Sequence, residues 1–200
     1  MSHNANILLF LLVLLCTPAT DVYGSPAYES HAGGGISFRY STSIYSRTSY
    51  FPTEPACKSN ELPCLNLFHI RLHRTHTTGG TQFDSGSACW GSIDACSDIP
   101  RAQNYWIGPE GEVRISDPTA AVTRREMGKW VVYEAFSLCG WTRSTGEYFP
   151  YGGQCYSAVL ASQDKTVEFT FLLGEAGCRK IEKCWRTKLN SLRYMLSSVE

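Results

Sequence analysis

The sequence predicts an α+β protein with a mainly antiparallel sheet, a C-terminal amphipathic helix packed on one face, and disulfide bonds that staple the fold. Three observations predict this class. Apolar and polar residues alternate in several short segments, as in half-buried strands. Near the C-terminus, apolar residues recur every three or four positions, as in an amphipathic helix. Eight cysteines follow a predicted export signal, and cysteines of exported proteins usually form disulfides.

Residues 1–24 are predicted to be a signal peptide. The stretch from Ile7 to Leu15, ILLFLLVLL, has the length of a secretory signal core and is too short to span a bilayer. Small residues near Gly24 and Ala27 offer cleavage sites. Residues 25–200 then form a single disulfide-containing α+β domain, because a chain of this size buries one core. We expect an exported protein, periplasmic or alternatively extracellular.

The charge composition argues against a basic surface that binds the phosphate backbone of nucleic acid. Lys plus Arg and Asp plus Glu both total 18, so the formal net charge is zero. Nucleic-acid-binding domains normally carry a basic field. After the signal, no apolar run reaches membrane-spanning length, so we expect no membrane span in the mature chain.

The first strands are predicted in residues 36–44 and 65–72. In both segments apolar or aromatic residues occupy alternate positions, so that one face is buried. Residues 25–35, SPAYESHAGGG, are small and polar and are expected to form a loose leader. Residues 74–111 are rich in Gly, Ser, Thr and Asp and have weak periodicity, so this part is predicted to be the least regular.

A short strand is predicted at residues 112–116, and a stronger pattern begins at Trp130. The segments WVVYEAFSL, CYSAVLA and TVEFTFLL alternate in hydrophobicity and are joined by short links, which predicts a three-stranded antiparallel meander. The period then changes to that of a helix, whose apolar stripe must pack against the sheet. The apolar positions of this helix are Ile181, Trp185, Leu189, Leu192, Leu196 and Val199.

Disulfides are predicted, and a metal site is not, for the eight cysteines that remain when Cys16 is removed with the signal. None of them form a CxxC, the short spacing that brings two thiolates to one zinc ion. The sequence leaves the connectivity open, and neighbouring cysteines are the simplest pairs. These local pairs are Cys57 with Cys64, Cys89 with Cys96, Cys139 with Cys155, and Cys178 with Cys184.

Two motifs resemble parts of known active sites. The STS at 41–43 and the pair Glu110 and Glu112 resemble elements of ADP-ribosylating toxins, but the arginine that this family carries on an earlier strand is missing. The DSG at 84–86 resembles the nucleophile motif of trypsin-like proteases, whose catalytic residues are spaced much farther apart along a longer chain. Neither reaction is predicted.

His69, His73 and His76 are the best candidates for metal ligands. On a strand, His69 and His73 share a face, but Arg71 lies between them on that face and would oppose the charge of a metal ion. We therefore expect solvent-facing or hydrogen-bonded histidines, with no metal site and no cofactor.

The turn between the first two strands of the meander is the strongest binding candidate. The segment CGWTRSTGEYFPYGGQC holds aromatic and Arg side chains, which are enriched at binding hot spots. Pairing of Cys139 with Cys155 would close this loop at its base while its tip projects. The equal alternative is that some aromatic residues fold back over the sheet edge. The predicted partner-binding residues are Trp141, Arg143, Tyr148, Phe149 and Tyr151.

The segment from WVVYEAFSLCG to KTVEFTFLLGEAGCRKIEKCWRTKLNSLRYMLSSV resembles the C-terminal half of small bacterial periplasmic proteins. Among these are DcrB-like and PsbP-like α+β domains and some immunity proteins of type VI secretion toxins. The resemblance lies in the order of three strands and a helix. It implies a non-enzymatic periplasmic immunity protein that neutralises a cognate secreted antibacterial effector by occluding its active site with loops such as residues 140–153.

Two other functional classes stay open. A secreted enzyme or toxin would have its site in residues 74–111, with His73, His76 and Asp84 as its first candidates. A stapled extracellular structural or adhesive domain is the third class. The expected partner is a protein in the first class, and nucleic acid is not expected in any of them.

Overall fold

The structure is a computed structural model that describes residues 27–52, 67–75, 83–97, 104–115, 117–142, 147–174 and 181–200. The predicted signal peptide lies outside these residues. So do Cys57, Cys64 and Cys178, and the side chain of Cys184 is also outside the described part. The two predicted pairs that these cysteines form therefore stay predictions.

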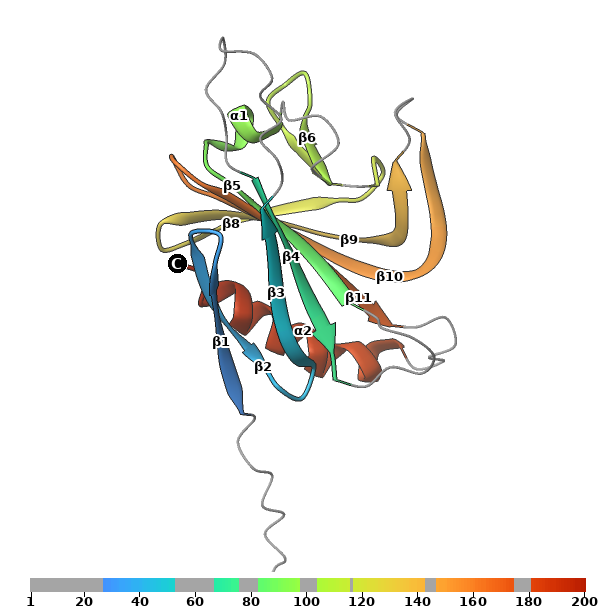
Figure 1. Cartoon of the computed structure of the whole chain (residues 1–200). Helices are drawn as coiled ribbons and strands as arrows, with labels where there is room; N and C mark the ends of the chain where they lie inside the picture. The colour runs from blue at the N-terminus through green and yellow to red at the C-terminus, as the bar shows by residue number, and fades with distance from the viewer. Residues whose placement is uncertain are drawn as a thin grey trace, which may run out of the picture.

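A seven-stranded antiparallel sheet is the centre of the fold, in the order β3-β4-β5-β11-β10-β9-β8 (Figure 1). Its strands are β3 (Tyr45–Pro52), β4 (Leu67–Arg74), β5 (Phe83–Cys89), β8 (Val122–Met127), β9 (Trp130–Thr142), β10 (Tyr148–Ala161) and β11 (Thr166–Gly174). Strand β9 pairs with β10, and β10 pairs with β11, so the predicted meander is confirmed.

Two hairpins and two helices complete the described part of the chain. The hairpins are β1 (Tyr28–Gly33) with β2 (Ile36–Ser41), and β6 (Tyr105–Ile107) with β7 (Val113–Ile115). The helices are α1 (Ile93–Ser97) and α2 (Ile181–Ser197). The strand predicted at 65–72 corresponds to β4 and the one at 112–116 to β7, whereas the strand predicted at 36–44 already ends at Ser41.

The predicted loose leader is wrong, because residues 28–33 form β1. Gly34 and Gly35 have φ values of 62° and 71°, which allow the tight turn into β2. A Cβ atom at Gly34 would lie 2.9 Å from the ring of Phe68, and one at Gly35 only 2.0 Å from the ring of Trp90. The glycines therefore let aromatic rings from the sheet pack against the turn. The sequence GGG does not reveal these contacts, because Phe68 and Trp90 are distant from it in the chain.

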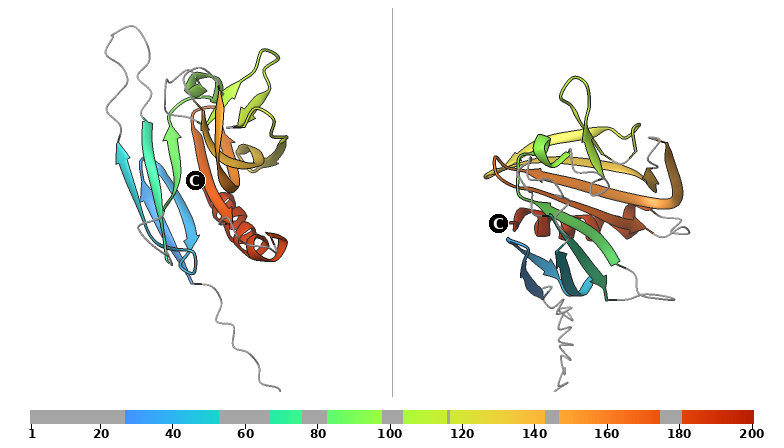
Figure 2. Two further views of the ribbon diagram at one scale, coloured as in Figure 1. Left: turned by 90° about the vertical axis from the view of Figure 1, so that its right-hand side faces the viewer. Right: turned by 45° about the horizontal axis from the view of Figure 1, so that its top comes forward.

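Helix α2 confirms the predicted C-terminal helix and lies against one face of the sheet (Figure 2). The apolar side chains from Leu189 to Val199 are part of the core on that face. Leu192, Met195 and Leu196 are almost completely buried there. Fully burying such a side chain contributes about 1.5–3 kcal/mol. The end of the chain is held against β2, because Glu200 and Ser37 exchange two backbone hydrogen bonds. Neither described helix has the length and apolar character to span a membrane.

A mainly-β class describes the protein better than the predicted α+β class. In the described part, α1 has only five residues and α2 has 17, while all other regular elements are strands. The antiparallel sheet, the C-terminal helix and the disulfide bonds are present as expected. The class prediction is therefore confirmed only in part, because several strands, β1, β5 and β8 among them, have weak sequence patterns and were not expected.

Strand β5 corrects the expectation that residues 74–111 are irregular. Its sequence FDSGSAC is poor in strand-forming residues, yet it lies between β4 and β11 in the sheet. The structure explains why glycine stands at position 86 of this strand. A Cβ atom there would lie 2.5 Å from the ring of Phe169 and 2.6 Å from the carbonyl oxygen of Glu168. A glycine within a strand marks such a close approach.

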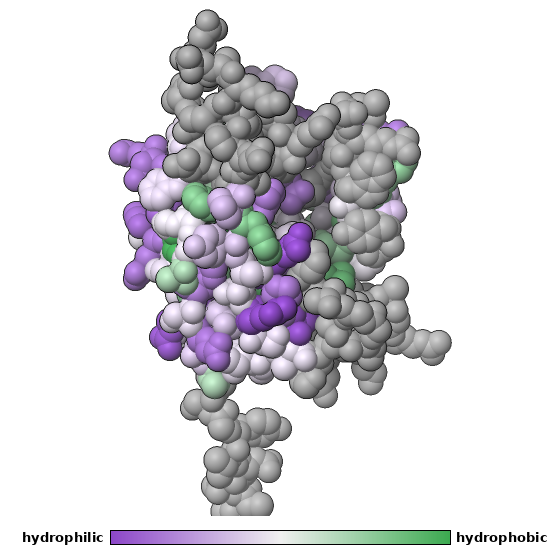
Figure 3. All heavy atoms as spheres, viewed as in Figure 1, coloured by the Kyte–Doolittle hydropathy of each residue, from purple (hydrophilic) through white to green (hydrophobic). Residues whose placement is uncertain are grey.

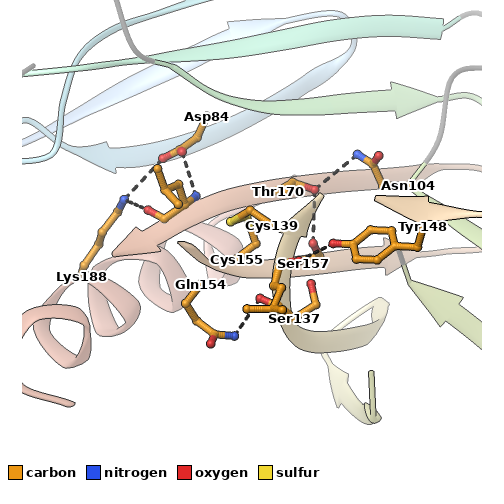
Figure 4. Close-up of a disulfide and its surroundings, with 12 residues drawn as sticks. Asp84, Asn104, Ser137, Cys139, Tyr148, Gln154, Cys155, Ser157, Thr170 and Lys188 are labelled. Atoms are coloured by element: carbon orange, nitrogen blue, oxygen red, sulfur yellow. Dashed lines mark hydrogen bonds and ion pairs between the residues drawn. A yellow bond between two sulfur atoms is a disulfide. The ribbon is translucent and has the colours of Figure 1, made fainter. Parts of the chain in front are cut away.

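One buried carboxylate connects four strands and a helix. Asp84 on β5 is 3% exposed and accepts hydrogen bonds from the Tyr45 hydroxyl at 2.6 Å and the Arg74 guanidinium at 2.7 Å. It also accepts the backbone N–H of Leu172 on β11 at 3.0 Å. The Lys188 ammonium of α2 lies 3.6 Å away (Figure 4). Two cations and two further donors thus compensate the loss of water around this charge.

Replacing Asp84 with Asn should destabilise the protein by about 3 kcal/mol, because the largely buried cations of Arg74 and Lys188 then lose this counter-ion. Urea unfolding followed by circular dichroism measures this change. The control is Glu126→Gln, which removes an exposed partner of Arg124 and should change stability by less than about 1 kcal/mol. Equal effects of the two substitutions would contradict a central role for Asp84.

Candidate functional site

The predicted binding segment, residues 140–153, belongs mostly to a hairpin and not to a loop. Strand β9 continues to Thr142 and β10 begins at Tyr148, so the strands extend beyond the two cysteines. The predicted disulfide between Cys139 and Cys155 is confirmed, with the Cα atoms 5.0 Å apart. We call residues 136–155 the β9–β10 ribbon. Its outer part curves away from the rest of the sheet (Figure 1).

The ribbon has no flanking strand along most of its described length. Strand β8 pairs with β9 only as far as Ala135, and β11 pairs with β10 only from Gln154 onward. Beyond these positions β9 and β10 pair only with each other in the described chain. An isolated two-stranded hairpin is marginally stable in water, so the Cys139–Cys155 bond is well placed to hold the ribbon together.

The structure describes the side chains of only two of the five predicted partner-binding residues. Tyr148 and Phe149 are both partly buried. The Tyr148 hydroxyl donates a hydrogen bond to the backbone carbonyl of Leu138, and its ring lies over Gly140, where a Cβ would be 2.5 Å away. Tyr148 therefore folds back onto β9, as the alternative expectation held. The side chains of Trp141 and Tyr151, and all of Arg143, lie outside the described residues.

Two exposed apolar side chains on the ribbon were not among the predicted binding residues. Phe136 is 38% exposed and Leu138 is 53% exposed. Phe136 stacks on Tyr156 and contacts Trp185 of α2, with ring centroids 5.1 Å and 5.8 Å apart. In the sequence both residues continue the buried face of β9. Their exposure depends on where the neighbouring strand ends, which the alternation of β9 does not show.

The second confirmed disulfide joins Cys89, at the end of β5, to Cys96 in α1. It was also one of the predicted local pairs. The Cα atoms are 6.1 Å apart and the bond closes a short segment of chain. The disulfide therefore holds α1 next to the sheet, and it lies far along the chain from the ribbon.

His73 and Asp84, two of the residues proposed for an enzyme site, do not come together in the described part of the chain. In the pairing of β4 with β5, His73 lies opposite Phe83 and Leu72 lies opposite Asp84. His73 and Asp84 therefore point to opposite faces of the sheet, because neighbouring strand residues alternate in direction. Asp84 is occupied by the contacts described above, and His76 lies outside the described residues.

The glutamate pair of the first motif and the metal-ligand candidate His73 form contacts with neighbouring residues that account for them structurally. Gly111 has a φ of 77°, so Glu110 and Glu112 flank a turn, and Glu112 accepts hydrogen bonds from the Glu110 backbone and from Arg114. His73 contacts the Ser49 hydroxyl at 3.1 Å. Within the described ranges, no three His, Cys, Asp or Glu side chains are grouped so that they could hold a metal ion.

A buried carboxylate on the face away from α2 has very different surroundings from Asp84. Glu168 is 6% exposed and accepts hydrogen bonds of 2.9 Å from the Ser87 hydroxyl and the Asn104 backbone. No described Lys, Arg or His forms an ion pair with it. Burial raises the pKa of Glu168 to about 7, although its two hydrogen bonds act in the opposite direction.

Polar side chains continue from Glu168 across the same face. Asn104 donates from its side-chain amide to Thr170 at 3.4 Å, and Thr170 lies 3.3 Å from the Ser157 hydroxyl (Figure 4). A carboxyl group with a pKa near neutrality can accept or donate a proton at physiological pH. The alternation of β11 places Glu168 on the polar side of its strand, so its burial was not apparent from the sequence.

Replacing Glu168 with Gln should change how stability depends on pH. The folded-state pKa is raised from 4.5 to about 7, so the contribution of this group is fully present below pH 4.5 and is lost as pH rises through about 7. The loss amounts to about 3 kcal/mol by pH 8. Glu168→Gln should therefore gain stability relative to the unmodified protein on going from pH 5 to pH 8.

Urea unfolding at pH 5, 6, 7 and 8 measures this difference, and groups common to both proteins cancel. The exposed Glu126→Gln serves as the control and should keep the slope of the unmodified protein. Parallel stability profiles for the unmodified protein and Glu168→Gln would show that Glu168 is ionised at an ordinary pKa.

The chain was compared with models of protein families, with curated proteins and with solved structures. None of the three comparisons finds a match. Support for a function therefore comes from the residues and their contacts.

Proposed function

We propose that this protein is a non-enzymatic, exported binding protein that inserts the β9–β10 ribbon into a cleft of a protein partner. In its most specific form, the proposal is a periplasmic immunity protein that occludes the active site of a cognate secreted antibacterial effector. The observation that carries the proposal is the ribbon itself, a pair of strands that continues past its neighbours and is cross-linked at its base by Cys139 and Cys155.

The shape of the ribbon favours insertion over contact with a flat surface. A two-stranded element is narrow, and here it extends beyond the strands that pair with its base. The disulfide restricts its conformations before binding, so less entropy is lost when a partner closes around it. Occlusion of this kind is steric and needs no catalytic group on the inhibitor.

The side chains of the ribbon suit a protein partner. Leu138 and Phe136 expose apolar surface on one face of β9, and Phe149 of β10, whose register partner is Trp141, is partly exposed on the other face of the ribbon. Exposed apolar surface on a projecting element marks an interaction site more often than isolated apolar residues do. Aromatic side chains in the centre of an interface commonly supply most of the binding energy.

The disulfide bonds support the proposed location of the protein in an oxidising compartment. Disulfides form and persist in oxidising compartments such as the bacterial periplasm and the extracellular space. Both described bonds stabilise elements at the surface of the sheet, the ribbon and α1. An exported partner would meet the protein in the same compartment.

The test begins with capture of the partner by the oxidised mature protein from lysate and secreted fractions of the native host. A single stoichiometric partner with a hydrolase or pore-forming sequence is expected, and its activity should be inhibited at equimolar ratio. A partner that stays fully active in the complex would contradict active-site occlusion.

The substitution Leu138→Asp should then weaken the complex by about tenfold or more, because burying a leucine contributes about 1.5–3 kcal/mol and a buried carboxylate is costly. Tyr194→Ala is the matched control, since Tyr194 is 39% exposed but lies beside Tyr28, towards the other end of α2. Calorimetric titration of both variants measures the affinities. Unchanged affinity of Leu138→Asp, or a loss confined to Tyr194→Ala, would contradict binding through the ribbon.

A further inference from the structure

Four basic or potentially basic side chains gather on one face of β3 and β4. Across this pair, Arg47 lies opposite His73, Ser49 opposite Arg71, and Phe51 opposite His69. Residues directly opposite each other in antiparallel strands point to the same face. This face is the one that does not pack against α2, since Ile70 and Leu72 alternate with these residues and lie in the core with the helix. Figure 3 shows strongly hydrophilic side chains over β3 and β4.

A pocket of about 280 Å³ opens within this cluster. Its lining residues are Phe51, His69, Ile70, Arg71, Ser85 and Gly86. Its volume lies just below the range of about 300–1,000 Å³ that is typical of sites for drug-sized ligands. The pocket therefore suits a small molecule, and its lining combines apolar, hydroxyl and cationic groups.

Arg71 is the central polar group of this pocket. Its guanidinium carbon lies 4.9 Å from the centre of the Phe51 ring, an arrangement in which a cation stacks on the face of an aromatic ring. Stacking uses the flat face of the guanidinium and orients its N–H groups in the plane at its edge. Those N–H groups match the geometry of a carboxylate, phosphate or sulfate. Ser85, opposite Arg71 on β5, adds a hydroxyl on the same side.

Two arginines on this face, Arg47 and Arg71, lie close enough to His73 to affect its pKa. Burial lowers the pKa of His73, and the charges of Arg47 and Arg71 lower it further. Among the described residues Arg47 has no ion-pair partner. On the next strands, Glu168 is directed at Ser87, and its raised pKa limits the negative charge that it contributes.

We propose that this pocket binds a small ligand that carries an oxyanion, either a carboxylate or a phosphate or sulfate group. Arg71 holds the oxyanion, the Ser85 hydroxyl and His69 supply further hydrogen bonds, and the Phe51 ring contacts the body of the ligand. The site is separate from the β9–β10 ribbon and does not depend on the proposed protein partner.

The test uses three anions, inorganic phosphate, sulfate and benzoate, each titrated into the oxidised protein at constant ionic strength set with sodium chloride. Backbone amide shifts in nitrogen–proton correlation spectra report where binding occurs. We expect saturable shifts at Arg71, Ser85 and Gly86 for at least one anion. Stronger binding of benzoate identifies a planar carboxylate with an apolar body, and stronger binding of phosphate or sulfate identifies the tetrahedral anions.

Arg71→Gln should weaken the binding of the preferred anion by about tenfold or more, because a charge-assisted hydrogen bond is lost. Arg124→Gln is the matched control, since Arg124 is exposed on β8, in the last strand at the other edge of the sheet. Spectra of both variants without ligand confirm that they fold. The proposal is overturned by absence of saturable shifts with all three anions, by unchanged affinity in Arg71→Gln, or by an equal loss in Arg124→Gln.

Discussion

The charge of Asp84 is the constraint on which much of the fold depends. Its carboxylate has contacts to β3 through Tyr45, to β4 through Arg74 and to α2 through Lys188. These residues are far apart in the chain, so their contacts form only when the whole sheet and the helix assemble. A buried carboxylate without them would be strongly unfavourable. The network therefore favours one arrangement of strands and helix over less specific packing of the same apolar residues.

Comparison of Glu134 with Glu168 shows that the partners of a buried carboxyl group, and not its burial alone, set the direction of its pKa shift. Burial alone would raise the pKa of Glu134, but hydrogen bonds from Arg125 and Tyr156 and the nearby charge of Arg193 hold it below its usual value. Glu168 is similarly buried and has only neutral donors, so its pKa rises to about 7. Asp84 and Glu134 hold elements on the side of α2, whereas Glu168 makes stability sensitive to pH on the opposite face.

The two proposed binding sites occupy different parts of the sheet and have different chemistry. The β9–β10 ribbon offers a narrow, cross-linked element with exposed apolar side chains, which suits a cleft in another protein. The pocket beside Arg71 offers positive charge and an aromatic ring, which suits a small anion. The core on the side of α2 supports both sites. Strand β4 buries there the face opposite the pocket, whereas β9 and β10 bury there the inner part of the face whose outer part exposes Phe136 and Leu138.

The sequence by itself determined the features that depend on neighbours in the chain. The alternation in β9, β10 and β11 and the stripe of α2 follow from local periodicity. The pairs Cys89–Cys96 and Cys139–Cys155 were the simplest choice by spacing, but the sequence left the connectivity open and the structure decided it. Only the tertiary structure decided that FDSGSAC lies between two strands, because the fit of Gly86 depends on Phe169, which is distant in the chain. Tyr148 was predicted as a candidate, whereas Leu138 was not, since side-chain exposure depends on which strand lies alongside. The cationic partners of Asp84 and the neutral ones of Glu168 are likewise set by long-range contacts that no local pattern contains.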